Sequence, residues 1–452
     1  MEKSFFFYDL ETSGLDARTD RIMQFAGQRT DMDLNPIGDP VNVLVKLADD
    51  TLPSPYAIRV TGITPQQTLA DGMSEVEFCR FVEKEIFTAG TVATGYNSVR
   101  FDDEFMRFAF WRNFFDPYEW TWRDGRSRWD LLDVVRLTRA LRPDGINWPV
   151  DKEGKATNRL ELITKLNGIS HEAAHDALSD VNALIDVAKL ICEKQPQLFK
   201  YLFEMRNKKE VAKLVNLEDR KPFVYASGRY SSEFNKTTVA WPLAPAPNGN
   251  VLVFDLRNNF EKMGKRVDRN GKETFFPMVK EMKYNHCPAV APLGVLEQED
   301  GWAKIGLAKA QVEENLAALL RHPEFAEQMR TEAEARPEWP AAKDAESALY
   351  DGFLENNDRV RCDAVRAAKD RDLADFHPEF NDPRLPELLL HYKGRNFPHT
   401  LDAKEQETWE KYRKGRIKAQ QNGYIKAIQE LMAAKADAFM LQELQLWYES
   451  VA

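Results

Sequence analysis

The stretch SFFFYDLETSG, residues 4–14, most constrains how the chain can fold. An apolar, aromatic run this short, closed by a glycine turn, predicts a buried strand. Asp9 and Glu11 are two positions apart, so a strand points both carboxylates to the same face. Such a pair repels unless a cation lies between its members, although many strands also end in acids that simply face solvent.

Further strands and helices are expected to follow in alternation. The spacing of apolar residues predicts two strands that form a meander with the first, then a helix, then a strand that leads into another helix. An amphipathic helix stopped by Pro143 and a last helix that ends at Pro196 complete the pattern. The two strands are expected at residues 21–31 and 41–50, and the helix after them at 72–87. Residues 91–105 are expected to form the next strand and helix, and the last two helices are expected at 127–142 and 175–196. This order predicts an α/β domain over residues 1–190.

The rest of the chain changes character twice. Residues 196–340 begin with a basic helix and become β-like, with proline and glycine punctuation that predicts a small barrel or sandwich. The stretch RPEWPAAKD is typical of a linker, and residues 341–452 are expected to be helical almost throughout. A chain of 452 residues is also too long for one core.

Composition excludes several classes of protein. No apolar run is long enough to span a bilayer and the N-terminus lacks a signal peptide, which predicts a cytoplasmic protein without a membrane role. The four cysteines lie far apart without a C-x-x-C pair, so a zinc ribbon or disulfide framework is not expected. The net charge of -10 argues weakly against nucleic-acid binding, but basic residues gather in separate segments, which permits a positive channel.

A third acidic residue lies in GYNSVRFDDEF. Asp102 follows an apolar stretch and is itself followed by Asp103 and Glu104. Acids here can serve as a helix cap and first turn, favoured by the helix dipole. That role fits Asp103 or Glu104, but it does not easily explain why Asn97 and Phe101 frame Asp102.

The stretch SHEAAHDALSD, residues 170–180, supports two incompatible interpretations. From His171 through Glu172 to His175 it is H-E-x-x-H, the pattern of a zinc metalloprotease helix. From His175 to Asp180 it is H-x-x-x-x-D, which fits one part of a metal-dependent nuclease site. On one helix His175 and Asp180 would not share a face, so they converge only if His175 stands at or before the helix start.

The order D-x-E, then N-x-x-x-F-D, then H-x-x-x-x-D resembles the DEDDh exonucleases of the ribonuclease-H-like superfamily. Further stretches are similar to the bacterial exodeoxyribonuclease I family along nearly the whole chain: GYNSVRFDDE, SRWDLLDV, LRPDGINWP and RNFPHTLD. The resemblance implies a ribonuclease-H-like α/β exonuclease domain over 1–190. It also implies a small SH3-like, β-containing DNA-binding domain over 196–340 and an α-helical C-terminal domain over 341–452.

The resemblance implies processive 3′→5′ hydrolysis of single-stranded DNA to 5′-mononucleotides, in DNA repair and recombination. Two Mg²⁺ ions, which Mn²⁺ can replace, would be held by four carboxylates: Asp9, Glu11, Asp102 and Asp180. The ions would activate the attacking water and stabilise the departing 3′ oxygen. His175 would be the general base, since its unperturbed pKa lies near neutral pH.

Substrate contacts are also implied by the resemblance. Glu11 and Thr12 would contact the terminal nucleotide, and Arg159 would bind substrate. Further contacts with the strand would come from Arg107, Tyr118, Trp122, Arg136, Lys208, Tyr350 and Phe353. The protein would act as a monomer and would bind the acidic C-terminal tail of single-strand-binding protein.

The sequence also allows two other functions, a zinc metalloprotease and a non-catalytic single-strand-binding protein. A zinc protease needs both histidines on one face in the middle of a helix, with Glu172 as base and a third ligand. Here NGIS immediately precedes His171 and no further histidine motif follows, which argues against that function. A catalytically silent single-strand-binding protein is disfavoured by the intact carboxylates.

Overall fold

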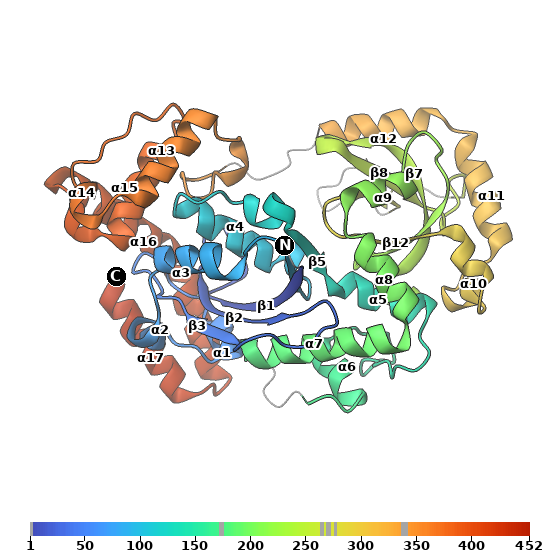
Figure 1. Cartoon of the computed structure of the whole chain (residues 1–452), viewed down its shortest axis with the longest axis horizontal. Helices are drawn as coiled ribbons and strands as arrows, with labels where there is room; N and C mark the ends of the chain where they lie inside the picture. Colours follow the sequence, from blue (N-terminus) through green and yellow to red (C-terminus); the bar gives the residue numbers. More distant parts are fainter. Residues whose placement is uncertain (1–2, 171–175, 263–265, 268–272, 275–277, 336–341) are drawn as a thin grey trace. The chain divides into compact units, whose positions relative to one another are not determined.

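The computed structural model describes residues 3–170, 176–262, 266–267, 273–274, 278–335 and 342–452. The chain divides into two compact units. The first comprises Met1–Ser127, Glu172–Asn182 and Trp339–Ala452, and the second comprises Arg128–His171 and Ala183–Glu338. The first unit therefore combines the N-terminal part of the chain with the C-terminal part (Figure 1).

A mixed sheet forms the framework of the first unit. Its strand order is β3-β2-β1-β4, with β5 beyond β4 at the boundary between the units. β1 pairs antiparallel with β2 and parallel with β4. The strands are β1 (Ser4–Thr12), β2 (Ile22–Thr30), β3 (Val41–Leu44), β4 (Thr91–Gly95) and β5 (Ser127–Asp130). The order places β1 in the interior of the sheet, in keeping with its aromatic run.

Helices from both ends of the chain belong to this unit (Figure 1). From the N-terminal part come α1 (Pro55–Thr61), α2 (Pro65–Asp71), α3 (Glu75–Phe81), its continuation as the π-helix η1 (Val82–Ile86), and α4 (Asp102–Arg112). From the C-terminal part come α13 (Asn356–Ala367), α14 (Asp370–Leu373), α15 (Leu385–Asn396), α16 (Ala403–Ala433) and α17 (Ala438–Val451). Short 3-10 turns are η2 (Ser98–Arg100), η3 (Glu119–Thr121), η4 (Arg123–Gly125), η8 (Leu349–Asp351) and η9 (Pro398–Thr400).

One hydrophobic core joins the sheet to the C-terminal helices. Phe6 and Tyr8 of β1 and Phe105 of α4 belong to the same buried cluster as Leu388 and Tyr392 of α15. Burial of aromatic and aliphatic surface is the main stabilising term of such a core. The C-terminal helices are therefore an integral part of the body that carries β1.

The second unit contains a small antiparallel sheet of order β11-β8-β7-β6-β12. Its strands are β6 (Phe223–Ala226), β7 (Thr237–Ala246), β8 (Asn250–Asp255), β11 (Val279–Met282) and β12 (Ala289–Pro292), and the short pair β9 (Arg266–Val267) and β10 (Glu273–Thr274) lies apart. Its helices are α5 (Leu131–Leu141), α6 (Leu160–Leu166), most of α7 (Ala177–Lys194), α8 (Pro196–Glu204), α9 (Lys208–Leu214), α10 (Gly301–Lys304), α11 (Lys309–Leu320) and α12 (Glu324–Glu334). The 3-10 turns are η5 (Ser232–Phe234), η6 (Pro247–Gly249) and η7 (Leu293–Glu297). The first six residues of α7, through Asn182, belong to the first unit.

The predicted secondary structure is largely confirmed, with two corrections. Residues 127–130 form β5 rather than the start of a helix, because the Asp130 side chain accepts a hydrogen bond from the Leu132 amide and caps α5 there. Residues 309–334 were predicted to belong to a β-like segment, but they form α11 and α12. All four cysteines are free thiols, as expected. Among the described residues, no helix has both the length and the apolar character to cross a membrane.

Candidate active site

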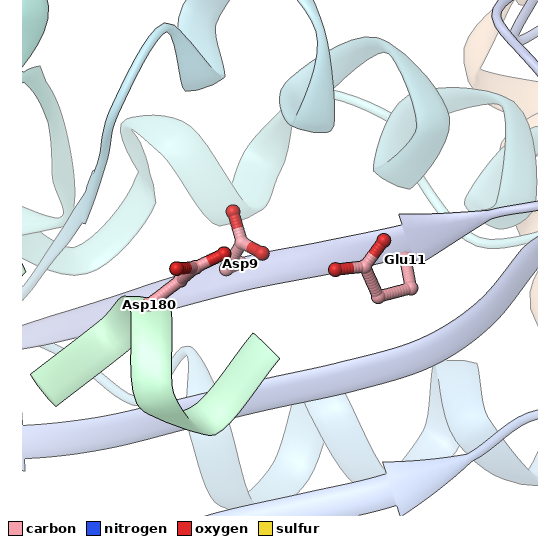
Figure 2. A group of neighbouring side chains, drawn as sticks. All are labelled: Asp9, Glu11 and Asp180. Atoms are coloured by element: carbon pink, nitrogen blue, oxygen red, sulfur yellow. The ribbon is translucent and has the colours of Figure 1, made fainter. Parts of the chain in front are cut away.

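Three carboxylates from two distant segments meet in the first unit. Asp9 and Glu11 project from β1 towards Asp180, which lies in the first turn of α7 (Figure 2). One carboxylate oxygen from each residue lies within 4.8 Å of the other two, and all three side chains are partly exposed. A hard divalent cation prefers such oxygen ligands, so this group is a candidate metal site.

The pattern of β1 determines which way the acids point. Phe6, Tyr8 and Leu10 are buried in the core on one face, so the alternation of the strand directs Asp9 and Glu11 to the opposite face. The pairing of β1 with β2 shifts register between Glu11 and Thr12. Such irregularities often redirect a side chain at the rim of a functional site.

Asp176, which sequence analysis did not single out, orients the third carboxylate. Its side chain accepts a hydrogen bond of 3.0 Å from the Ser179 amide, and its carbonyl accepts one of 3.0 Å from the Asp180 amide. These bonds fix the first turn of α7, from which Asp180 projects. An aspartate directly before an apolar-periodic helix is a typical N-cap, and that signal could have identified it.

The electrostatics of the group favour a cation. Burial raises the pKa of Asp9 from 3.8 to about 8, with a further contribution from Asp180. Burial also raises the pKa of Glu11 from 4.5 to about 8, and Asp9, Asp180 and Asp176 raise it further. A cation between these oxygens would favour their ionised forms, so the residues fit a divalent metal.

The raised pKa values predict how metal-free stability depends on pH. Since the folded state holds protons on Asp9 and Glu11 that the unfolded state loses above about pH 4, the free energy of unfolding should fall as pH rises from about 4 to about 8. A divalent cation bound by these carboxylates would compete with the protons, so we expect added Mg²⁺ to raise the melting temperature more near pH 8 than near pH 5. Thermal melts with EDTA or Mg²⁺ measure this. An Mg²⁺ effect that is equal at the two pH values would contradict the prediction.

Asp102 is the fourth carboxylate that the sequence predicts as a metal ligand. It is the first residue of α4 and only 4% exposed. The next residue, Asp103, accepts a 2.5 Å hydrogen bond from the hydroxyl of Tyr8, the neighbour of Asp9. The start of α4 is thus tied to β1, but Asp102 is not among the residues whose oxygens all lie within 4.8 Å.

Thr12 closes the strand with its side chain turned into the loop. The residue is buried, and its hydroxyl donates a 2.7 Å hydrogen bond to the Gly14 carbonyl. A Cβ at Gly14 would lie 2.3 Å from Oδ2 of Asp20, so a larger residue there would require the Asp20 side chain to move. The hydrogen bond fixes the backbone directly after Glu11.

Four of the residues predicted to contact single-stranded DNA form one cluster in the first unit. The Arg107 guanidinium lies 5.5 Å from the Tyr118 ring centroid and donates to the Tyr350 hydroxyl at 3.4 Å. The Tyr118 and Phe353 ring centroids are 5.8 Å apart. Phe353 is 80% exposed, and Trp122 of the same unit is 61% exposed. Exposed rings beside a guanidinium are suited to stacking with nucleobases.

Three other residues that the resemblance implies as DNA contacts lie in the second unit: Arg136, Arg159 and Lys208. Arg136 donates to Oδ1 of Asp133 at 2.5 Å, and Arg159 forms a 2.5 Å ion pair with Glu161. Lys208 is the exposed first residue of α9. The predicted general base His175, together with His171 and Glu172 of the alternative zinc motif, lies outside the described residues.

Comparisons with known proteins cover nearly the whole chain. Residues 6–188 match the family model described as Exonuclease, residues 206–332 match the Exonuclease I SH3-like domain, and residues 343–451 match the Exonuclease I C-terminal domain. The chain is 38% identical to exodeoxyribonuclease I of Haemophilus influenzae, over 99% of this chain and 98% of that one.

Solved structures agree with these matches. The structure of E. coli exonuclease I in complex with a dA16 oligonucleotide is similar with a TM-score of 0.94 and 36% identity, over 100% of both chains. A structure of SSB/exonuclease I in complex with the inhibitor CFAM has a TM-score of 0.90 and 34% identity, over 100% of both chains. The predicted fold class is confirmed: an exonuclease domain, an SH3-like domain and a C-terminal helical domain.

Proposed function

The chain belongs to the bacterial exonuclease I family, and on that premise we propose that it is a processive exonuclease that degrades single-stranded DNA from the 3′ end. Its products are 5′-mononucleotides, and its role lies in DNA repair and recombination. The observation that carries the proposal is the meeting of Asp9, Glu11 and Asp180 in one group that favours a cation.

The proposed cofactors are two Mg²⁺ ions, which Mn²⁺ can replace. Asp9, Glu11 and Asp180 would hold them, with Asp102 as the fourth carboxylate. When bound, such cations supply positive charge at the scissile phosphodiester, which otherwise repels an anionic nucleophile. The same charge requires the ionised forms of the carboxylates, so metal binding and deprotonation are linked.

His175 completes the proposed chemistry as general base. Its imidazole takes a proton from the attacking water, whose oxygen forms the new bond to phosphorus. The bond from phosphorus to the 3′ oxygen of the preceding nucleotide breaks, and that oxygen takes up a proton to become the new 3′ hydroxyl. An imidazole suits this role because its pKa lies near neutral pH.

Further side chains are proposed to bind the single-stranded DNA. Glu11 and Thr12 would contact the terminal nucleotide. The other proposed contacts are Arg107, Tyr118, Trp122, Arg136, Arg159, Lys208, Tyr350 and Phe353. Guanidinium and ammonium groups suit the phosphates, and aromatic rings suit the bases.

Replacing Phe353 by alanine should weaken DNA binding without unfolding the protein. The ring is 80% exposed, so its removal costs little stability. Loss of one stacked base should raise KM for single-stranded DNA roughly 5- to 150-fold, equivalent to about 1–3 kcal/mol. The matched control is Phe439→Ala, since Phe439 is 65% exposed on α17. Steady-state kinetics on both variants test this, and an equal KM in the two would contradict the stacking role.

Single-strand-binding protein is the proposed protein partner, through its acidic C-terminal tail. A solved relative contains SSB together with exonuclease I, which supports the pairing. We further propose that the protein acts as a cytoplasmic monomer. The proposed domain boundaries are 1–190, 196–340 and 341–452.

Labelled DNA tests the function directly. With Mg²⁺, single-stranded DNA labelled at its 3′ end should lose the label at once as a mononucleotide, whereas 5′-labelled DNA should shorten progressively. EDTA should stop both reactions. Intact DNA after incubation with Mg²⁺ would favour a silent binding protein. Cleavage of a protein substrate that depends on Zn²⁺ would favour the protease interpretation of His171, Glu172 and His175.

A further inference from the structure

The loop that joins β1 to β2, residues 13–21, adjoins the candidate active site. It starts two residues after Glu11 and is closed by two hydrogen bonds of 2.8 Å, from the Ser13 amide to the Arg21 carbonyl and from the Arg21 amide to the Ser13 hydroxyl. Its residues from Leu15 to Arg18 line a cavity of about 160 Å³, together with Glu104 and Tyr350. The loop therefore forms one wall of this cavity.

Side chains from the C-terminal part of the chain hold the loop. Nη2 of Arg416, on α16, donates a 2.9 Å hydrogen bond to the Thr19 carbonyl. Nη2 of Arg21, the last residue of the loop, donates a 2.8 Å hydrogen bond to Oε2 of Glu346. The loop is thus attached at two points to residues more than three hundred positions later in the chain.

These contacts belong to a buried network of charges. Nη2 of Arg395, on α15, lies 2.5 Å from Glu346 and 2.7 Å from Asp50. Arg416 lies 3.6 Å from both carboxylates, and Arg21 lies 3.5 Å from Asp50. Asp50 and Glu346 are fully buried. Burial alone would raise the pKa of Glu346, but Arg395 and Arg21 hold it well below its usual range, so the carboxylate is ionised.

Such a network gives the loop a defined shape. A buried charge is strongly destabilised when a partner is removed, so each arginine is confined to the position that satisfies both carboxylates. The sheet pairing between β1 and β2 ends at Thr12 and Ile22, so it does not itself fix residues 13–21. Preorganised elements bind a flexible ligand better because less ordering remains to be done on binding.

We propose that Glu346, Arg395 and Arg416 are positioning residues, through which the C-terminal helices hold loop 13–21 in the shape that receives the terminal nucleotide. The proposal rests on the proposed function. It gives the C-terminal helices a second role besides contributing to the core. The network does not include Asp9, Glu11 or Asp180. Its loss should therefore weaken binding of the DNA end and leave metal binding unchanged.

The test compares Glu346→Gln with a matched control, Glu405→Gln. Glu405 also pairs with a buried cation, since Nζ of Lys393 donates to both its oxygens at 2.7 Å, but it does not contact the loop. In Glu346→Gln, amide hydrogen exchange in a peptide spanning residues 13–21 should be faster by about tenfold or more. KM for single-stranded DNA should rise about tenfold, with kcat within about twofold and the Mg²⁺ requirement unchanged. The control should change none of these, even if its melting temperature falls.

A second variant keeps the proposal testable if Glu346→Gln does not fold. Arg416→Gln removes the hydrogen bond to the Thr19 carbonyl and leaves the pairs of Glu346 with Arg21 and Arg395 in place. Unchanged exchange in the loop, or faster exchange with unchanged KM, would overturn the proposal. A wild-type protein that does not degrade DNA would instead refute the proposed function. The exchange experiment needs no substrate and would still decide whether the network holds the loop.

Discussion

Replacing Asp9 by asparagine is expected to lower kcat about a thousandfold or more while leaving the protein folded. A metal charge held by this carboxylate would be worth several kcal/mol in the transition state. About 4 kcal/mol corresponds to a thousandfold in rate. The variant should also melt at a higher temperature than wild type in EDTA near pH 8, because it lacks one member of the repulsive group.

The combination of these two effects identifies a metal ligand. An ordinary structural residue would lose activity and stability together, whereas Asp9→Asn should lose activity and gain metal-free stability. Mg²⁺ should then raise its melting temperature less than that of wild type. Asp33→Asn is the control, since Asp33 is exposed in the connection between β2 and β3. Near-normal activity of Asp9→Asn in Mg²⁺ would contradict the assignment.

The second large effect is expected at His175. Loss of a general base typically costs 10²- to 10⁴-fold, so His175→Ala should lower kcat by about that factor. The wild-type rate should rise with pH through about 6.5, and the variant should lack this rise, since it has no imidazole to deprotonate. The pH profile of kcat on single-stranded DNA measures both effects.

Glu172→Gln separates the two interpretations of the same motif. In a zinc protease Glu172 would be the base, and its removal would abolish activity. In the exonuclease it has no catalytic role, so Glu172→Gln should retain the wild-type rate and pH profile. A variant that loses DNA hydrolysis as completely as His175→Ala would require a revised role for this residue.

The alternation in β1 was sufficient to predict that Asp9 and Glu11 share a face, because the period of a strand is local information. Asp180 was singled out from the H-x-x-x-x-D spacing that begins at His175, which is also local information. The convergence of β1 and α7 came instead from the resemblance, since the contact joins segments far apart in the chain. The structure brings the carboxylates of Asp9, Glu11 and Asp180 together there, and Asp102 is the first residue of α4.

Two features escaped prediction for different physical reasons. The start of α5 was misplaced because SRWDLLDV has apolar residues that fit a helix as well as a strand, and the capping aspartate at position 130 was overlooked. The buried charge network could not be found from sequence at all. Arg21 and Glu346 are 325 residues apart, and each alone is typical of a solvated surface charge.

We infer that the carboxylates of β1 and α7 hold the catalytic cations. The most direct test is a crystal structure with Mn²⁺ and single-stranded DNA, in which anomalous scattering locates the metal. We expect two Mn²⁺ sites roughly 3.5–4 Å apart, coordinated by Asp9, Glu11 and Asp180, with Asp102 as the fourth ligand. Mn²⁺ bound elsewhere, with these side chains uncoordinated beside a bound DNA end, would contradict it.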